Sequence, residues 1–257
     1  MVALEVVLGS NRLDNFSLVL TDFERTLVRL FEKRSDEQRF FAEVKNECIK
    51  RGIPVRVLKA AGESPYLLWT RAYRWMARYG NSLDAEKMYH AFTRSAIKYE
   101  MEAAQSVRLF AEVVPVLEKL KTAGIPVGIV SNNGTDAVKQ ILTRNQVFRE
   151  GDQNSLVDFV IGRKFQHEMV GKLKPKPNLL VEALERSNCD PSTALLVGDS
   201  VDDMKAGKAA GVRLRVGVLE HSTATKRQLR RAGARLVLQR FGDLLPLVPG
   251  GDVSRVH

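Results

Sequence analysis

Short, mostly apolar runs that alternate with helical patterns constrain the fold of this chain more than any other feature. The runs lie at residues 16–21, 125–130, 157–161, 194–197 and 212–218. Runs of this kind are typical of strands that are buried on both faces of a parallel sheet. Helical patterns lie between them at residues 114–123, 135–144 and 178–187. The sequence therefore predicts an α/β fold, a doubly wound parallel sheet with helices on both faces.

A long segment between the first two runs interrupts this alternation. Residues 29–107 have an almost entirely helical pattern and are too long for an ordinary crossover connection. Apolar and aromatic side chains form a stripe on one of these helices, as in the core of a small bundle (Leu68, Trp69, Ala72, Tyr73, Trp75, Met76 and Tyr79). We expect two domains: an α/β core formed by residues 1–28 and 108–257, and a helical cap domain formed by residues 29–107.

The composition is that of an ordinary globular protein. Of 257 residues, 44% are hydrophobic and 27% are charged, which is enough apolar material for a core. Cys48 and Cys189 match no metal-binding or redox spacing, which favours a reducing compartment. Neither a signal peptide nor a membrane-spanning stretch is recognisable, so we expect a soluble, cytoplasmic protein. Residues 1–13 fit an extra edge strand or a loose tail, and the oligomeric state is left open.

Positive charge is concentrated in one segment. The net charge is +10, and residues 205–240 contain ten lysines and arginines against a single acid, Glu220. Such a field attracts anionic substrates or surfaces. A solvated helix face is nevertheless the simpler interpretation, because charge patterning alone rarely identifies a partner. Nucleic acid is left as an open but less favoured partner, and we expect no membrane partner.

Two acids follow the first apolar run. Asp22 comes directly after residues 16–21 and Glu24 lies two positions later, so both are expected over the carboxyl edge of the sheet. One such carboxylate can attack a phosphorus atom, and the other can deliver a proton to the leaving oxygen. Taken alone, this segment is also compatible with a simple helix cap.

A hydroxyl group and a predicted tight turn follow the run at residues 125–130. In the sequence Ser131-Asn132-Asn133-Gly134, the hydroxyl and the backbone N–H groups can hold a phosphoryl oxygen. A helix cap is the simpler interpretation when the segment is considered by itself.

Lysine and proline alternate at residues 174–177. Proline stiffens the backbone and prevents a helix there, so the side chain of Lys174 is expected to point in a fixed direction. An ammonium group fixed beside carboxylates and a phosphate balances their charge and orients a nucleophile. Lys172 and Lys176 are competing candidates, although the alternation favours Lys174.

Acids cluster again after the run at residues 194–197, where Asp199, Asp202 and Asp203 follow Gly198. Acids clustered at a strand end cost free energy unless they bind a cation. Hard oxygen ligands, completed by waters and a substrate phosphate, are the pattern that Mg²⁺ prefers. This is the most specific of the four segments.

Together the four segments resemble the haloacid dehalogenase superfamily, specifically its phosphatase-like members of the phosphoglycolate phosphatase type, which have a helical cap inserted after the first motif. The order and spacing match along essentially the whole chain, most closely between Lys174 and Gly211. The resemblance implies a Mg²⁺-dependent phosphatase that hydrolyses a small phosphorylated metabolite through an aspartyl-phosphate. It implies Asp22 as nucleophile, Glu24 as acid and base, Ser131, Asn132 and Lys174 as phosphate-binding residues, and Asp22, the Glu24 main-chain carbonyl, Asp199 and Asp203 as metal ligands.

The chain departs from the family pattern at Glu24, where an aspartate is usual. The extra methylene moves the carboxyl by about 1.5 Å, and a misplacement of about 1 Å can cost on the order of a hundredfold in rate. Arg25 likewise replaces a common glycine.

Three alternative functions are compatible with parts of the pattern. A dehalogenase of this superfamily is disfavoured, because relatives with that activity lack acids at the positions of Glu24 and Asp199. A sugar-phosphate mutase would use the same core residues. The third alternative is a binding or scaffold protein with impaired catalysis, which would use the basic segment at residues 205–240 as its surface.

Overall fold

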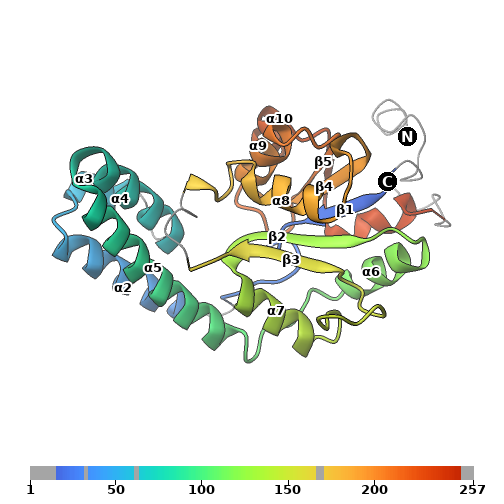
Figure 1. The fold of residues 1–257 in the computed structure, drawn as a ribbon, viewed down its shortest axis with the longest axis horizontal. Coiled ribbons are helices and arrows are strands. Elements are labelled where there is room, and N and C mark those ends of the chain that lie inside the picture. The colour runs from blue at the N-terminus through green and yellow to red at the C-terminus, as the bar shows by residue number, and fades with distance from the viewer. Residues whose placement is uncertain (1–15, 32–33, 61–63, 166–170, 250–257) are drawn as a thin grey trace. The chain divides into compact units, whose positions relative to one another are not determined.

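The computed structural model describes residues 16–31, 34–60, 64–165 and 171–249 (Figure 1). The alternatives considered for residues 1–13 lie outside these described residues. Contacts among the described residues divide the chain into two compact units. One unit contains the described parts of 1–29, 107–163 and 172–257, and the other contains those of 30–106 and 164–171.

A parallel sheet forms the centre of the first unit and confirms the predicted fold class. Its six strands are ordered β3-β2-β1-β4-β5-β6, and every pairing is parallel. The strands are β1 (Leu18–Thr21), β2 (Val127–Gly134), β3 (Phe159–Arg163), β4 (Ala194–Gly198), β5 (Leu214–Val218) and β6 (Leu236–Leu238). The last strand has three residues and was not expected from the sequence, because so short an apolar run carries no periodic signal.

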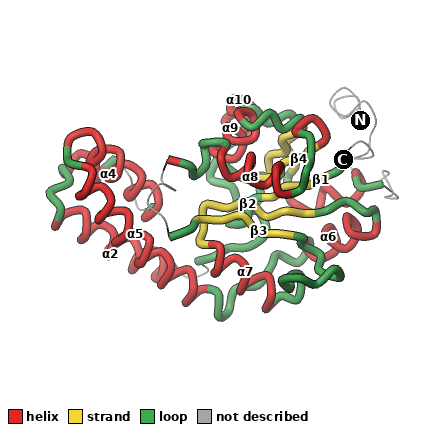
Figure 2. The backbone as a smooth tube through the Cα atoms, in the orientation of Figure 1, coloured by secondary structure: helices red, strands yellow, loops and turns green. Residues whose placement is uncertain are grey.

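Helices cover both faces of this sheet (Figure 2). Figure 1 places α6 (Val113–Thr122) and α7 (Thr135–Arg144) on one face. It places α8 (Asn178–Arg186), α9 (Val201–Ala209) and α10 (Lys226–Ala232) on the other. The described part of this unit also contains two 3₁₀ helices, η2 (Pro191–Thr193) and η3 (Phe241–Leu247). Each longer helix turns an apolar stripe inward, as α8 does with Leu179, Leu180, Ala183 and Leu184.

The strand order places the ends of β1 and β4 side by side. Thr21, the last residue of β1, is paired with Val197 of β4 and with Ile129 of β2. The chain crosses to opposite faces of the sheet on either side of β1, which makes this point a topological switch. Ligands of open parallel sheets bind beyond the carboxyl ends of strands at such a point. The residues that follow β1, β2 and β4 are therefore the candidates for a functional site.

The second unit is helical and has an aromatic core. Its described helices are α2 (Arg34–Lys50), α3 (Val55–Lys59), α4 (Pro65–Tyr79) and α5 (Ser82–Ala103). Ring stacking joins the helices, with centroids 4.2 Å apart for Trp69 and Phe92 and 5.0 Å apart for Phe40 and Tyr99. The predicted stripe on α4 is only partly buried, because Tyr79 is 62% exposed. No helix among the described residues has the length and apolar character to cross a bilayer.

A buried carboxylate and lysine cluster

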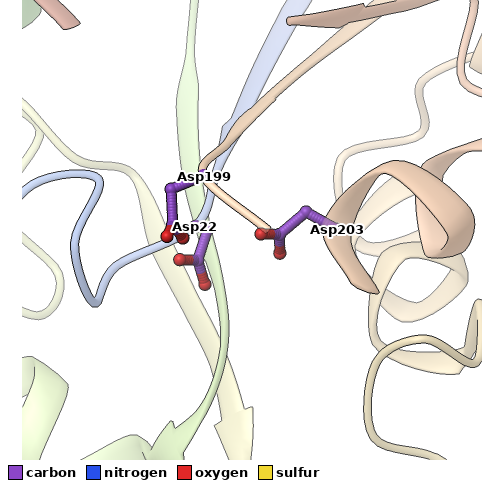
Figure 3. Close-up of side chains that lie close together, drawn as sticks. All are labelled: Asp22, Asp199 and Asp203. Carbon is purple, nitrogen blue, oxygen red and sulfur yellow. The ribbon is translucent and has the colours of Figure 1, made fainter. Parts of the chain in front are cut away.

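Three acids from separate segments meet beyond the carboxyl edge of the sheet (Figure 3). Asp22 follows β1, Asp199 follows β4, and Asp203 lies in the first turn of α9. One carboxylate oxygen of each lies within 4.8 Å of the corresponding oxygens of the other two. All three residues are buried, with 1% to 6% of their surface exposed. The fold therefore collects acids that are far apart in the sequence into one group that could hold a metal ion.

Lys174 places its ammonium group inside this cluster. The Nζ atom donates to Oδ1 of Asp22 and Oδ1 of Asp203, both at 2.5 Å, and to the carbonyl of Val130 at 2.9 Å. All three N–H donors of the ammonium are thus used. Lys172 and Lys176, the competing candidates from the sequence, are both exposed. Although burial lowers the pKa of Lys174, the charges of Asp203 and Asp22 outweigh it and raise that pKa above its usual range.

The acids have unusual proton affinities. Burial, reinforced by the charge of Asp203 and opposed by Lys174, raises the pKa of Asp22 to about 6. Burial, followed by the charges of Asp22 and Asp203, raises the pKa of Asp199 to about 9. Three carboxylates against one ammonium leave two negative charges unbalanced when all are ionised. A divalent cation would restore neutrality, and the all-oxygen donor set suits a hard ion.

Asp199 and Asp203 differ in how their side chains are held. Both oxygens of Asp203 are engaged, since Oδ1 accepts from Lys174 and Oδ2 accepts from the backbone N and Oγ of Ser200. Among the described residues, no hydrogen-bond donor contacts the carboxylate of Asp199. A buried carboxylate without a donor is costly. Asp199 is consequently the acid whose environment is best satisfied by a cation.

Local sequence choices place Asp203. Ser200 caps α9 and forms a reciprocal capping box with Asp203, so the acid is fixed to the first helical turn. Gly198 is required in front of it, because a Cβ atom at this position would lie 2.6 Å from the Cβ of Asp203. The carboxylate of Asp203 can approach the end of β4 only because residue 198 has no side chain.

The segment after Asp22 forms a compact turn without a helix, so helix capping does not account for the acids there. Arg25 has a φ of 63°, a left-handed conformation that costs a residue with a side chain about 1–2 kcal/mol. This is the position where the family pattern often has glycine. Glu24 is not part of the group formed by Asp22, Asp199 and Asp203. Its Oε1 lies 3.9 Å from Nε of Arg25, and its side chain is 25% exposed.

Ser131 and Asn132 belong to an extension of β2 that was expected to be a turn. The strand continues to Gly134, with a register shift in its pairing to β3 between Val130 and Gly134. The hydroxyl of Ser131 donates to Oδ1 of Asn133 at 2.9 Å and accepts from its backbone N at 3.1 Å. Irregularities of this kind redirect side chains at the edges of sheets and beside active sites.

The carboxamide of Asn132 brackets the main chain of Lys174. Its Oδ1 accepts from the backbone N of Lys174 at 2.9 Å, and its Nδ2 donates to the carbonyl of Lys174 at 3.1 Å. The main-chain carbonyl of Asn132 itself accepts from Nη1 of Arg163 at 3.2 Å. Asn132 of β2 thereby holds Lys174, and Arg163 at the end of β3 holds Asn132.

Three residues that sequence analysis did not single out support the cluster. Thr26 donates to Oδ2 of Asp22 at 3.4 Å, Ser200 holds Asp203, and Ser222 donates to the main-chain carbonyl of Asp199 at 2.5 Å. The Ser200-x-x-Asp203 spacing is a readable capping signal. Ser222 lies in the loop after β5 and carries no local signal.

Comparison with known proteins gives a family and relatives. The model of the family described as haloacid dehalogenase-like hydrolase matches residues 70–216, a range that contains Ser131, Lys174, Asp199 and Asp203 but not Asp22. The phosphoglycolate phosphatase of Pectobacterium atrosepticum is 29% identical over 213 residues, which cover 78% of this chain and 83% of that protein. Pyrophosphatase PpaX of Bacillus velezensis is 32% identical over 139 residues, covering 52% of this chain and 57% of that protein.

Solved structures share the fold. A hydrolase from Pseudomonas syringae superposes with a TM-score of 0.62 at 21% identity, and the match covers 89% of this chain and 96% of that one. At this level of identity the similarity concerns the fold alone.

Proposed function

Because this chain belongs to the haloacid dehalogenase-like hydrolase family, we propose that it is a Mg²⁺-dependent phosphatase that hydrolyses a small phosphorylated metabolite through an aspartyl-phosphate. The observation that carries the proposal is the ammonium of Lys174, which bridges the carboxylates of Asp22 and Asp203 beyond the carboxyl edge of the sheet. The names of two relatives, a phosphoglycolate phosphatase and a pyrophosphatase, support phosphate-bearing substrates.

Asp22 is the proposed nucleophile. In the first step, one of its carboxylate oxygens bonds to phosphorus while the bond between phosphorus and the ester oxygen breaks, and Glu24 gives a proton to that leaving oxygen. In the second step, the oxygen of a water molecule bonds to phosphorus while the Glu24 carboxylate takes up one proton of that water. The bond between phosphorus and Asp22 then breaks and releases inorganic phosphate. With a pKa of about 6, Asp22 is ionised and nucleophilic at neutral pH.

Lys174, Ser131 and Asn132 are proposed to hold the transferring phosphoryl group. Phosphoryl transfer is catalysed mainly by positioning and by neutralisation of charge, which a fixed ammonium supplies. The Ser131 hydroxyl now donates to Asn133, but its proton can rotate toward a phosphoryl oxygen. Since both polar atoms of the Asn132 side chain hold Lys174, its main-chain N–H is the group we assign to phosphate.

The residues fit a bound Mg²⁺. Asp22, Asp199, Asp203 and the main-chain carbonyl of Glu24 would hold it, and the Asp199 carboxylate lacks any donor among the described residues. When bound, the ion neutralises negative charge on the phosphoryl oxygens. Its charge would also oppose the effects of burial and of the Asp22 and Asp203 charges, which raise the pKa of Asp199.

We also propose a division of labour along the chain. Residues 1–28 and 108–257 would form the catalytic core, and residues 29–107 would form a cap that excludes water and selects the substrate. A cytoplasmic location is supported by the two cysteines, which are both free.

Hydrolysis of an aryl phosphate with and without Mg²⁺ tests this function. We expect turnover that depends on Mg²⁺ and that Asp22→Asn abolishes, because an amide cannot act as the nucleophile. Asp136→Asn is the matched control, since Asp136 is an exposed acid in the first turn of α7. Absence of hydrolysis by the wild type across a broad panel of phosphate esters would contradict the proposal and favour a binding protein. Phosphoryl transfer between two positions of one sugar phosphate would instead indicate a mutase.

A further inference from the structure

The basic segment at residues 205–240 has no part in the proposed phosphoryl transfer, and the fold separates its cations into two kinds. Arg215 of β5 is buried, and its guanidinium donates to the main-chain carbonyls of Val212, Arg213 and Gly233. These bonds connect the loop before β5 to the carboxyl end of α10. The other cations of the segment are exposed, so they are available to contact another molecule.

Four exposed cations of α10 line one hollow, which we call the basic hollow. Lys226, Arg227, Arg230 and Arg231 line a shallow depression of about 540 Å³ that is wide open to solvent. The opposite side of the same helix carries Leu229 and Ala232, which pack in a core cluster with Met204 of α9. Packing thus uses the apolar face of α10 completely, and the face toward solvent is cationic.

The basic hollow lacks compensating acids. None of its four cations lies within ion-pair distance of a carboxylate in the part of the chain that the structure describes. The pairs Lys226 and Arg230, and Arg227 and Arg231, have the helical spacing at which like charges repel. Lys208 of the neighbouring α9 adds a further exposed cation beside Gly233, at the end of α10. An arrangement that repels itself is stabilised when an anion binds to it.

The chemistry of this surface selects among anionic partners. The described large hydrophobic side chains that are exposed all lie outside α9 and α10. Helices that bind a membrane interface bury an apolar face in it, and protein interfaces have a more apolar centre. Single-stranded nucleic acids are bound through aromatic stacking as well as charge. The backbone of a duplex needs only lysine and arginine.

We propose that the basic hollow binds the phosphate backbone of a nucleic-acid duplex without reading its base sequence. The sequence alone favoured a solvated helix face. Three observations favour a binding surface instead. The four cations line one depression, they have no acidic partner among the described residues, and the apolar side of α10 is already packed. The proposal does not rest on the phosphatase function, because the two sites share no residue.

Fluorescence anisotropy of the full-length protein with labelled duplexes of two unrelated sequences tests it. We expect equal affinity for both, weakening steeply between roughly 50 and 200 mM salt, as phosphate contacts release counterions. In a variant that combines Lys226→Glu, Arg227→Glu, Arg230→Glu and Arg231→Glu, we expect binding at least about tenfold weaker. The slope of log affinity against log salt should become shallower by about 3 to 4, at roughly 0.9 per lost contact.

The matched control reverses four exposed cations of the helical unit, with Lys45→Glu, Lys50→Glu, Arg71→Glu and Arg74→Glu. This control changes the net charge equally and should retain binding, so an equal loss in both variants would overturn the proposal. Absence of duplex binding by the wild type at the lowest salt would also overturn it. Binding to vesicles that contain phosphatidylserine, without binding to duplex, would assign the surface to a lipid instead. Thermal unfolding checks that each variant is folded. If the charge-reversed variant does not fold, a variant with the same four residues changed to Gln takes its place.

Discussion

Lys174 and the cations of the basic hollow use positive charge in opposite ways. The ammonium of Lys174 is buried, meets two carboxylates and a carbonyl, and has no donor left. The cations of α10 are exposed and meet no carboxylate among the described residues. The Lys174 charge is held by three hydrogen bonds, whereas the α10 charges face solvent.

This difference determines what each region can do. A buried charge interacts strongly and in one direction, and removing its partner leaves an uncompensated charge behind. Exposed charges are weak individually and are screened by salt, so they act only as a group. A single substitution should therefore damage the buried cluster, whereas the basic hollow requires several.

Lys174→Met should have the largest effect, because Asp22 and Asp203 lose their shared countercharge. We expect turnover of an aryl phosphate to fall by up to about a thousandfold, as when a preorganised donor is removed from an active site. Unfolding in urea at pH 8 should show a loss of about 3–5 kcal/mol, as for other broken buried ion pairs. The loss should shrink at pH 5, where the acids can be protonated.

Lys176→Met is the matched control, since Lys176 is an exposed lysine two residues away. It should change neither the turnover of the aryl phosphate nor the free energy of unfolding measurably. Equal effects of the two substitutions would contradict the contrast between buried and exposed cations.

Asn132→Ala should have an intermediate effect, because it removes both hydrogen bonds that bracket the main chain of Lys174. A displacement of the ammonium by about 1 Å would lower kcat on the order of a hundredfold. KM should change little, since the ammonium and the main-chain N–H groups remain. Steady-state kinetics and the position of Lys174 in a crystal structure of the variant check this. An unchanged kcat would show that the proline-rich backbone alone fixes the lysine.

Metal binding should depend on pH with a smaller, graded effect. With a pKa of about 9, Asp199 is protonated at neutral pH before a cation binds, and the cation binds the ionised form. Affinity for Mg²⁺ should therefore rise with pH up to about 9, by roughly tenfold per unit while a single proton is displaced. Calorimetry at pH 7.5 in buffers of different ionisation enthalpy should detect about one released proton per ion. Asp199→Asn should weaken binding and remove the proton release, whereas proton release that persists in it would assign the proton elsewhere.

The fold was largely predictable because its signals are local. Buried parallel strands are short apolar runs, and β1, β2, β3, β4 and β5 each contain part of a predicted run. The strand β6 was missed because three residues carry no periodicity. The tight turn expected at residues 131–134 was wrong, because tertiary pairing with β3 extends β2 through these residues. Local residue preferences cannot anticipate a register shift that a neighbouring strand imposes.

The site was predictable only in part. Asp22 and Asp199 could be named because each follows a strand, and parallel strands bring their carboxyl ends to one edge. Lys174 could be named because the alternating prolines fix the direction of its side chain. Ser222 could not, because its contact with Asp199 joins two loops without a shared local pattern. The two hydrogen bonds from the Asn132 carboxamide to the main chain of Lys174 were not predicted either, since the sequence suggested only phosphate binding for Asn132.

The sequence by itself determined which residues are candidates for the chemistry and how strands and helices alternate, because both depend on residue type and short-range spacing. Only the tertiary structure decided that Lys174 bridges Asp22 and Asp203, that Asp199 lacks a donor among the described residues, and that Arg215 is buried while the cations of α10 are exposed. Burial and hydrogen bonding depend on segments that are distant along the chain. The residue type gives the formal charge of a side chain, but its burial and the neighbouring charges determine its electrostatic role.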